Sequence, residues 1–446
     1  MTDAITDAVT DEELAVFHRV VGKLRALPVD DPVRLRTEQV AASFARDGRL
    51  RRRKARGTEI SAADASVMAA TATGALDRRE DAPLAAPGSG GVFHKPRGCY
   101  VCKSPYRQVD SFYHRLCPRC AADNTARRAL STELAGRRAL VTGGRVKIGF
   151  QLALMMLRDG AELLVTSRFP HDTVRRFRAA PGSEGWLDRL TVLAVDLRDP
   201  RQVLGLCEEL RQEGRPLDIL VNNAAQTVRR PPESYALLAA GERDALPQGA
   251  RQAPGFRPTR MIEGGAAALP TVLREADEAG LLPDPSPENS WSARLGALDP
   301  AEVLETQLVN ALAPALLCDR LLPLLLASPH PRRYVVNVTA VEGRFAVRNK
   351  TAGHPHTNMA KAALNMLTRT GAAELAELGV HMCAVDTGWI TDENPAPKKA
   401  RMAGSGFRTP LDVVDGAARV YDPIVRGEAG DPVSGVFLKD YREAEW

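Results

Sequence analysis

The 446-residue sequence lacks any run of about 18 uncharged apolar residues, the length that a membrane-spanning helix needs. Its first residues, Met1-Thr-Asp-Ala-Ile, are polar and acidic and lack the basic and apolar regions of a signal peptide. The net charge of +5 is small for this length and does not by itself predict a nucleic-acid partner. We therefore expect a cytoplasmic chain that does not contact membranes.

Cysteine is scarce and odd in number, since the chain has only 7. This count indicates a reducing compartment rather than a disulfide framework. Two Cys-x-x-Cys pairs stand out, formed by Cys99, Cys102, Cys117 and Cys120. Two such pairs at this separation are typical of a tetrahedral zinc held by four thiolates. Four thiolates leave no open position for catalysis, so we predict a structural zinc or a docking module for a protein partner over residues 92–130.

The other thiols and the nearby histidine have simpler interpretations. His114 lies between the two pairs and is a spare ligand candidate, otherwise expected at the surface. Cys207, Cys318 and Cys383 fall in apolar patterns and are expected in the core. A redox role of the cysteine pairs is disfavoured because thiol exchange needs only one such pair.

Residues 1–91 are predicted to form a helical region followed by a linker. Apolar spacing predicts a helix that begins near residue 11 and ends before Pro28, a second over about 33–47, and a third capped by Ser61. Residues 81–91 have the composition of a linker. The basic run 49–56 could contact phosphates, but the lack of interleaved aromatic residues favours a solvated helix face.

A glycine turn opens the third predicted region, residues 136–446. The apolar run Ala139 to Val141 is typical of a buried strand, Gly143 and Gly144 interrupt it, and an amphipathic helix follows. Glycines let the backbone approach a pyrophosphate, and the free N–H groups at a helix start attract its charge. This pattern predicts the start of a dinucleotide-binding unit.

Three more strands are predicted over residues 161–168, 190–197 and 218–225, alternating with helices. Such alternation predicts an α/β fold with a doubly wound parallel sheet of the Rossmann type. The second strand ends at Arg168, where an acid would bind the ribose hydroxyl of NAD and a base favours the 2′-phosphate of NADP. Arg145 and Lys147 add positive charge, so we predict NADP, with NAD as the alternative.

Together, these pieces resemble the short-chain dehydrogenase/reductase superfamily from about Gly136 to Trp446. The resemblance rests on the ordered segments Thr142-Gly143 to Ile148-Gly149, Asp196-Leu197, Asn222-Asn-Ala-Ala225, Asn310, Tyr334 to Val341, Asn358-Met-Ala-Lys361 and Val385-Asp-Thr-Gly388. It implies that the cofactor contacts Thr142, Gly143, Arg145, Lys147, Ile148, Gly149, Arg168, Asp196, Leu197, Asn223, Ala224, Ala225 and Lys361.

The sequence departs from the family at the catalytic positions. The family's tyrosine, whose phenol transfers a proton to the substrate oxygen, is replaced by Thr357. The serine position is Ala340, with Thr339 one residue earlier. A phenol with a pKa near 10 can be tuned toward neutrality, whereas an aliphatic hydroxyl cannot, so Thr357 is predicted to be a poor proton donor. The resemblance implies that Lys361 still binds ribose and that Asn310 still holds a water.

Smaller departures and substitutes complete the predicted site. Lys147 replaces the middle glycine of the loop. Thr387 replaces the proline of the family's Pro-Gly turn, which the segment Val385-Asp-Thr-Gly388 resembles. His354 or His356 could supply a proton in place of the phenol, with a surface or substrate-contact role as the default. Asp386 and Asp392 are weaker candidates. The predicted catalytic set is therefore Lys361, Asn310, Thr357, Thr339 and His356.

Residues 226–302 are longer than a minimal member of the family needs, and their prolines exclude one continuous helix. We expect this insert to cap the site or to form an interface. Arg229 and Arg230 could bind an anionic substrate group or pair with surface acids.

Two functions follow from the sequence. The first is an NADP(H)-dependent oxidoreductase with an atypical site, which transfers hydride to or from a carbonyl, imine or activated double bond of a small molecule. The second is a catalytically silent NADP(H) sensor or scaffold, whose zinc module contacts protein or nucleic acid. Substrate and subunit number stay open, with a homodimer or homotetramer expected.

Overall fold

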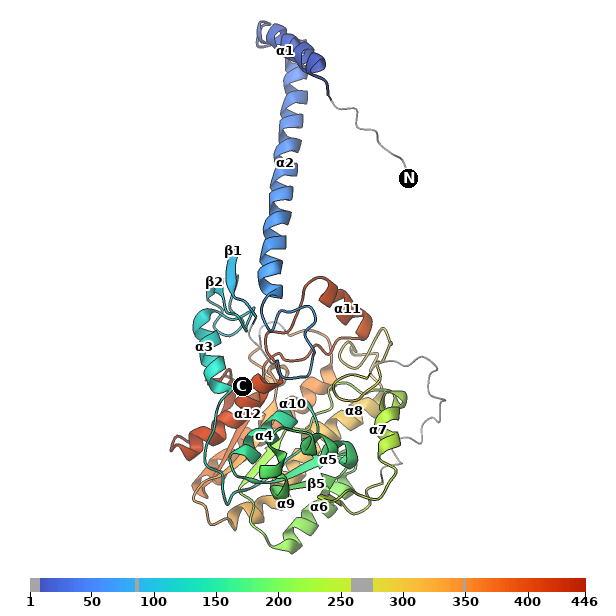
Figure 1. Ribbon diagram of the computed structural model, residues 1–446, viewed down its shortest axis with the longest axis vertical. Coiled ribbons are helices and arrows are strands. Elements are labelled where there is room, and N and C mark those ends of the chain that lie inside the picture. The colour runs from blue at the N-terminus through green and yellow to red at the C-terminus, as the bar shows by residue number, and fades with distance from the viewer. Residues whose placement is uncertain (1–8, 85–87, 258–275, 348–349) are drawn as a thin grey trace. The chain divides into compact units, whose positions relative to one another are not determined.

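The computed structural model describes residues 9–84, 88–257, 276–347 and 350–446 (Figure 1). The chain divides into two compact units after Ser66. All residues of the predicted zinc, cofactor and catalytic sites belong to the second unit, Val67–Trp446.

The first unit is helical and contains α1 (Asp11–Arg25) and most of α2 (Pro32–Ala69). Thr10 caps α1, because its Oγ1 accepts the Glu13 N–H while the Glu13 carboxylate accepts the Thr10 N–H at 2.9 Å. The prediction of separate helices over 33–47 and from Ser61 is wrong, since α2 is continuous. The Ser61 hydroxyl donates to the Gly57 carbonyl at 2.8 Å, so Ser61 lies inside the helix and does not cap one.

The second unit begins with a small module around the four cysteines. Strands β1 (Gly91–Gly98) and β2 (Pro105–Val109) pair antiparallel, and helix α3 (Pro118–Arg127) follows. Cys117 is the N-cap residue of α3 and Pro118 its first helical residue, a favourable position for a residue without an N–H. The aromatic side chains of Phe93 and Tyr113 are fully buried in the core of this module.

The main sheet has the order β11-β10-β9-β8-β6-β3-β4-β5-β7. Its strands are β3 (Arg138–Val141), β4 (Glu162–Ser167), β5 (Leu190–Ala194), β6 (Ile219–Asn222), β7 (Ala250–Gln252), β8 (Arg333–Thr339), β9 (Val380–Asp386), β10 (Phe437–Lys439) and β11 (Arg442–Ala444). All neighbouring pairs are parallel except β10 and β11. The predicted doubly wound parallel sheet is therefore confirmed, and β7 and β11 extend its edges.

Helices cover both faces of this sheet (Figure 1). Side chains alternate along β3, because Ala139 and Val141 belong to one apolar cluster and Leu140 to the other. The first cluster includes side chains of α4 (Lys147–Arg158), α5 (Pro170–Arg178) and α12 (Val413–Glu428). The second includes α6 (Pro200–Glu213), α9 (Ala313–Leu326) and α10 (Pro355–Glu377). The remaining helices are α7 (Ala236–Gly241), α8 (Pro300–Gln307) and α11 (Ala396–Gly404), among the described residues.

A turn of π-helix, η5 (Leu308–Leu312), interrupts the long helix formed by α8 and α9. Pro314 has no N–H to donate to the carbonyl four residues earlier, that of Asn310, which accounts for the irregular turn. By length and composition alone this helix, Pro300–Leu326, would suit a membrane. However, Leu317 and Leu321 pack in the second apolar cluster, as in a core helix.

Candidate functional site

The end of β3 is locked to the end of β6 by Thr142. Its Oγ1 accepts the N–H groups of Asn223 and Ala224, both at 2.9 Å. In return, the Asn223 side-chain amide donates to the carbonyls of Thr142 at 3.0 Å and Gly143 at 3.2 Å. The structure thus brings the predicted cofactor residues of two distant segments into one hydrogen-bonded unit at the carboxyl edge of the sheet.

Glycines make the loop between β3 and α4 possible. Gly143 has φ +70°, in the left-handed region. A Cβ atom on Gly149 would lie 2.2 Å from the Gly143 carbonyl oxygen and 2.5 Å from Asn223 Nδ2. On Gly144, a Cβ would lie 2.7 Å from Val165 Cβ. The loop is therefore a closed backbone cradle at a helix N-terminus, and its chemistry fits a pyrophosphate.

Two aromatic rings flank Arg168 at the end of β4. Its guanidinium carbon lies 5.6 Å from the ring centroid of Phe169 and 5.3 Å from that of Tyr235. These two rings stack on each other, with centroids 5.9 Å apart. Cation–π contacts of this kind orient a guanidinium without neutralising its charge. Tyr235 comes from the insert, and no motif in the sequence could have linked it to Arg168.

Other polar residues at this end of the cleft are engaged within the protein. Arg145 donates to Asp172 and to the Ala279 carbonyl, both at 2.7 Å. Burial would raise the pKa of Asp196, but hydrogen bonds from Arg198 hold that pKa below its ordinary value. A cavity of about 290 Å³ lies beside Asp196 and is lined by Asp196, Arg198, Asp199, Gln202, Phe256, Arg257, Glu305 and Leu308.

Lys147, at the family's middle glycine, has φ +55°, the backbone conformation that a glycine would adopt freely. Its Nζ lies 2.9 Å from Asp81 and 3.8 Å from Glu393. Burial would lower the pKa of Lys147, but the charges of Glu393 and Asp81 raise it. Lys147 was predicted to add positive charge that favours NADP, and in the structure its ammonium pairs with these acids.

Asp81 belongs to a segment, residues 78–84, that we call the strap. Three consecutive strap residues form ion pairs with three different elements: Arg79 with Glu278 of the insert, Glu80 with Lys399 of α11, and Asp81 with Lys147. The sequence indicated only linker composition from residue 81 onward. The ion-pair partners of the strap lie 66 to 319 positions away in the sequence, so local patterning could not predict these contacts.

Lys361 and Thr339 meet at the end of β8. Lys361 Nζ donates to the Val338 carbonyl at 2.8 Å, and Thr339 Oγ1 donates to the Lys361 carbonyl at 3.5 Å. Burial lowers the pKa of Lys361 to about 8, against the opposing charge of Glu342. The amine is thus poised to exchange a proton near neutral pH.

Thr357 and His356 lie on the first turn of α10 and are buried. The Thr357 hydroxyl and both ring nitrogens of His356 have no hydrogen-bond partner among the described residues. Burial lowers the pKa of His356, so its ring is neutral at pH 7 and holds no acidic proton. His354 instead stacks on Trp291 of the insert at 3.7 Å, and its Nδ1 lies 3.0 Å from the Trp291 carbonyl.

The Asn310 side chain holds the chain that leaves β6. Its Oδ1 accepts the Gln226 N–H at 2.7 Å, and its Nδ2 donates to the Gln226 carbonyl at 3.0 Å. The side chain is therefore engaged by the backbone, while Pro314 leaves the Asn310 carbonyl without its helical donor. A water held at this position would be bound by the carbonyl.

Two acids near Lys361 complete this part of the site. Glu342, which sequence patterning did not single out, follows β8, and burial raises its pKa. Its carboxylate interacts with the charges of Asp386, Lys350 and Lys361. Asp386 accepts the Gly388 N–H at 3.0 Å and lies 3.5 Å from Lys439 Nζ.

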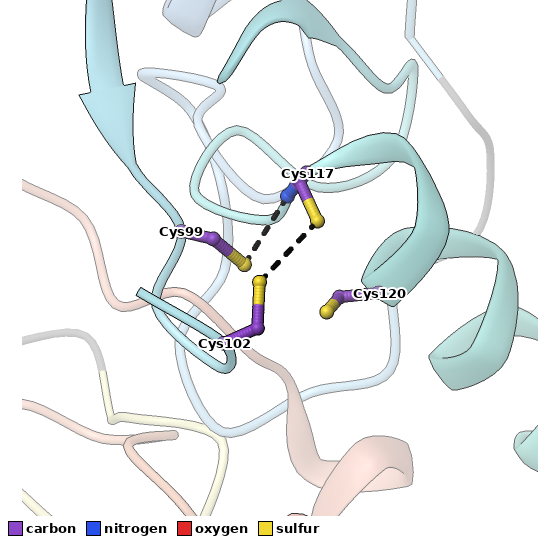
Figure 2. Close-up of side chains that lie close together, drawn as sticks. All are labelled: Cys99, Cys102, Cys117 and Cys120. Atoms are coloured by element: carbon purple, nitrogen blue, oxygen red, sulfur yellow. Dashed lines mark hydrogen bonds between the residues drawn. The ribbon is translucent and has the colours of Figure 1, made fainter. Parts of the chain in front are cut away.

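Four sulfur atoms converge in the cysteine module (Figure 2). The Sγ atoms of Cys99, Cys102, Cys117 and Cys120 all lie within 4.8 Å of one another. Cys102 and Cys117 are 3.7 Å apart, and the Cys117 N–H donates to Cys99 Sγ at 3.3 Å. In a tetrahedral zinc site with Zn–S bonds of about 2.3 Å, sulfur atoms lie about 3.8 Å apart. The arrangement fits such a metal.

His114 does not belong to this cluster of sulfurs. Its ring is buried, and Nδ1 lies 2.8 Å from the Thr73 hydroxyl. The expectation of a surface histidine is wrong, because the turn containing Thr73 covers it. Arg229 is paired with acids, with 2.8 Å to Asp299 and 3.5 Å to Glu305, so the structure favours the ion-pair alternative for this residue.

The strand order and the glycine cradle define a Rossmann-like nucleotide-binding fold. The family model described as short chain dehydrogenase matches residues 137–238, and that described as Enoyl-(Acyl carrier protein) reductase matches residues 286–405. These two matches support membership of the chain in the short-chain dehydrogenase/reductase superfamily. Residues 239–285, between the two matches, lie within the predicted insert.

Relatives and solved structures span different parts of the chain. An uncharacterized protein, R665, of Acanthamoeba polyphaga mimivirus is 32% identical over 350 residues, which cover 74% of this chain and 71% of that protein. A probable oxidoreductase of Streptomyces antibioticus is 39% identical over 95 residues, which cover 21% of this chain and 30% of that protein. The structure of NADPH-bound carbonyl reductase from chicken fatty liver is 17% identical, with a TM-score of 0.44, and the match covers 71% of this chain and 100% of that one.

Proposed function

We propose that this chain is an NADP(H)-dependent oxidoreductase that transfers hydride to or from a carbonyl, imine or activated double bond of a small molecule. One observation carries the proposal: the cradle built by Thr142, Gly143 and Asn223 is intact, and Lys361 is buried at the end of the neighbouring strand β8. Membership of the short-chain dehydrogenase/reductase superfamily supports the same reaction class.

The residues fit NADP better than NAD. Arg168 presents a guanidinium on two aromatic rings where the adenosine ribose is expected, and a guanidinium matches a phosphate in charge and geometry. The glycine cradle would hold the pyrophosphate and Lys361 the second ribose. When bound, the nicotinamide group supplies or accepts the hydride.

The proton must come from a group other than Thr357, whose hydroxyl cannot be tuned to neutral pH. His356 is neutral at pH 7 because burial lowers its pKa. Lys361 holds a proton on Nζ at neutral pH and releases it near pH 8. An imine or an activated double bond makes the smallest demand for such a proton, so these two classes suit the residues better than an ordinary ketone.

Turnover assays with two variants test this proposal. NADPH oxidation would be followed with a panel of carbonyls, imines and activated alkenes. We expect Lys361→Ala to abolish turnover and Thr357→Ala to leave it within threefold of the wild type. A Thr357→Ala variant that lost activity while retaining the fold would contradict the assignment of the proton to another group.

The alternative is a catalytically silent NADP(H) sensor or scaffold. It is favoured by the buried Thr357 hydroxyl and by Ala340, which together leave both hydroxyl positions of the family without their usual groups. NADPH binding without turnover of any member of the panel would support this function over the enzyme.

For the four-thiol cluster we propose a structural zinc, because four thiolates close the coordination sphere. Elemental analysis of the purified chain should give one zinc per chain, and Cys102→Ser should lower that content. A full zinc content in Cys102→Ser would argue against the four-cysteine set.

A further inference from the structure

The cysteine module shares its apolar core with segments that border the cofactor cleft. The cluster that contains Cys99, Cys117 and Cys120 also contains Ile390 and Leu411, which follow β9. Partly buried Ile148 of the glycine loop packs against the same cluster. The module therefore packs against the glycine loop and the segment after β9, which would border the proposed nucleotide site, although four thiolates would leave its metal no role in chemistry.

One side chain extends from the first cysteine pair, Cys99–Cys102, which we call the knuckle, to the turn after β9, which we call the late turn. Tyr100 lies between the two ligands Cys99 and Cys102, and its hydroxyl accepts the Trp389 N–H at 2.9 Å. A Cβ on Gly388 would lie 3.5 Å from the same hydroxyl. The phenol thus contacts Trp389 and lies beside Gly388, the two residues that end the late turn, 385–389.

Two lysine ammonium groups lie near the Tyr100 ring, and one of them also pairs with an acid of the turn. The Lys103 ammonium lies 5.2 Å from the ring centroid and that of Lys439 lies 5.5 Å from it. Lys439 also lies 3.5 Å from Asp386, whose carboxylate accepts the Gly388 N–H. Tyr100 and Asp386 therefore hold consecutive backbone amides of the turn, those of Trp389 and Gly388, in fixed directions.

We propose that Tyr100 is a positioning residue for the late turn, and that the metal of the knuckle acts on nucleotide binding by fixing Tyr100. The inference rests on the proposed function, in which the late turn flanks the nicotinamide. A metal that fixes Cys99 and Cys102 also fixes the two residues between them, one of which is Tyr100. Without the metal or without the hydroxyl, the Trp389 amide loses its partner and the turn loses its fixed conformation.

A matched pair of variants tests the proposal. Tyr100→Phe and Tyr106→Phe each remove one hydroxyl from the module, and the Tyr106 hydroxyl donates to the His114 carbonyl at 2.7 Å, inside the module. We expect Tyr100→Phe to raise the NADPH dissociation constant about fivefold, the usual effect of one lost hydrogen bond. Tyr106→Phe should change it less than twofold, and both variants should keep the wild-type zinc content.

Hydrogen–deuterium exchange without nucleotide gives a readout that is independent of cofactor binding. Tyr100→Phe, and removal of zinc by a chelator, should each speed exchange in the peptide containing residues 386–390. The peptide covering β8, Arg333–Thr339, serves as a control for global unfolding and should not change.

Several outcomes would overturn the proposal. Unchanged exchange at 386–390 after zinc removal would do so, as would equal effects of the two tyrosine variants on NADPH affinity. A chain that takes up no metal when supplied with zinc would also overturn it. If the wild type binds no NADPH, the proposed function fails, whereas the exchange measurement still decides whether Tyr100 and the metal fix the turn.

Discussion

The first half of the fold, around β3 and β6, departs less from the family pattern than the second half, around β8 and α10. In the first half, Thr142, Gly143, Gly149 and Asn223 keep both their identity and their mutual contacts. In the second half, Lys361 remains, and by the proposed alignment Thr357 and Ala340 stand at the two hydroxyl positions of the family. Holding a nucleotide depends on backbone geometry that few residues can satisfy, whereas proton transfer depends on the pKa of one side chain. The first requirement can therefore persist while the second changes.

The largest effect is expected from Gly149→Ala in the first half. The added Cβ would lie 2.2 Å from the Gly143 carbonyl oxygen, a backbone atom that cannot move without opening the cradle. We expect a loss of about 3 kcal/mol in unfolding free energy and NADPH binding too weak to measure. Gly371→Ala in α10, where the nearest atom would be Leu375 Cδ1 at 3.8 Å, is the matched control: it should raise the unfolding free energy by about 0.5–1 kcal/mol through helix propensity and leave NADPH binding unchanged. Normal NADPH binding by Gly149→Ala would show that the cradle is not the cofactor site.

The second prediction concerns the pH dependence of Lys361. Burial lowers its folded-state pKa from 10.5 to about 8, so between these values the unfolded chain binds a proton that the folded chain does not. The stability that Lys361 contributes is therefore present above pH 10.5 and is lost as the pH falls through 8. Relative to Lys361→Met, the wild type should gain about 2 kcal/mol between pH 7.5 and pH 9.5, measured by urea unfolding. Parallel stability curves of the two proteins would contradict the lowered pKa.

A smaller effect is expected at Arg168, where a comparison of NADPH with NADH isolates the contribution of the 2′-phosphate. Arg168→Ala should weaken NADPH binding about tenfold, the value of one charge-assisted contact, and leave NADH binding unchanged. Arg211→Ala on the exposed side of α6 removes the same charge elsewhere and should affect neither nucleotide. Equal losses for NADPH and NADH would mean that Arg168 supports the fold and does not read the 2′-phosphate.

The smallest effect is expected from Thr357→Val in the second half. The change keeps the shape of the side chain and removes a buried hydroxyl that has no partner among the described residues. We expect the unfolding free energy to rise by about 1 kcal/mol, with NADPH affinity unchanged. Destabilisation by Thr357→Val would indicate that the hydroxyl is bonded, for example through an ordered water.

The parts that sequence patterning predicted are those encoded locally. The strand predicted over 190–197 overlaps β5, and that over 218–225 contains β6, because apolar runs between helices mark buried parallel strands. The four thiols could be grouped because their spacing is itself the signal. The placement of Tyr100 against Trp389 could not be predicted, since the contact joins residues 289 positions apart. The same holds for Asp81 on Lys147 and for Tyr235 beside Arg168.

Calorimetric titration of the full chain with NADPH and with NADH tests the central claim most directly, namely that the first half of the sheet holds a nicotinamide nucleotide. The structure predicts saturable binding of one NADPH per chain, with NADH bound at least tenfold more weakly because Arg168 has no phosphate to contact. Absence of binding by either nucleotide at millimolar concentration, in a chain shown to be folded and loaded with zinc, would contradict it.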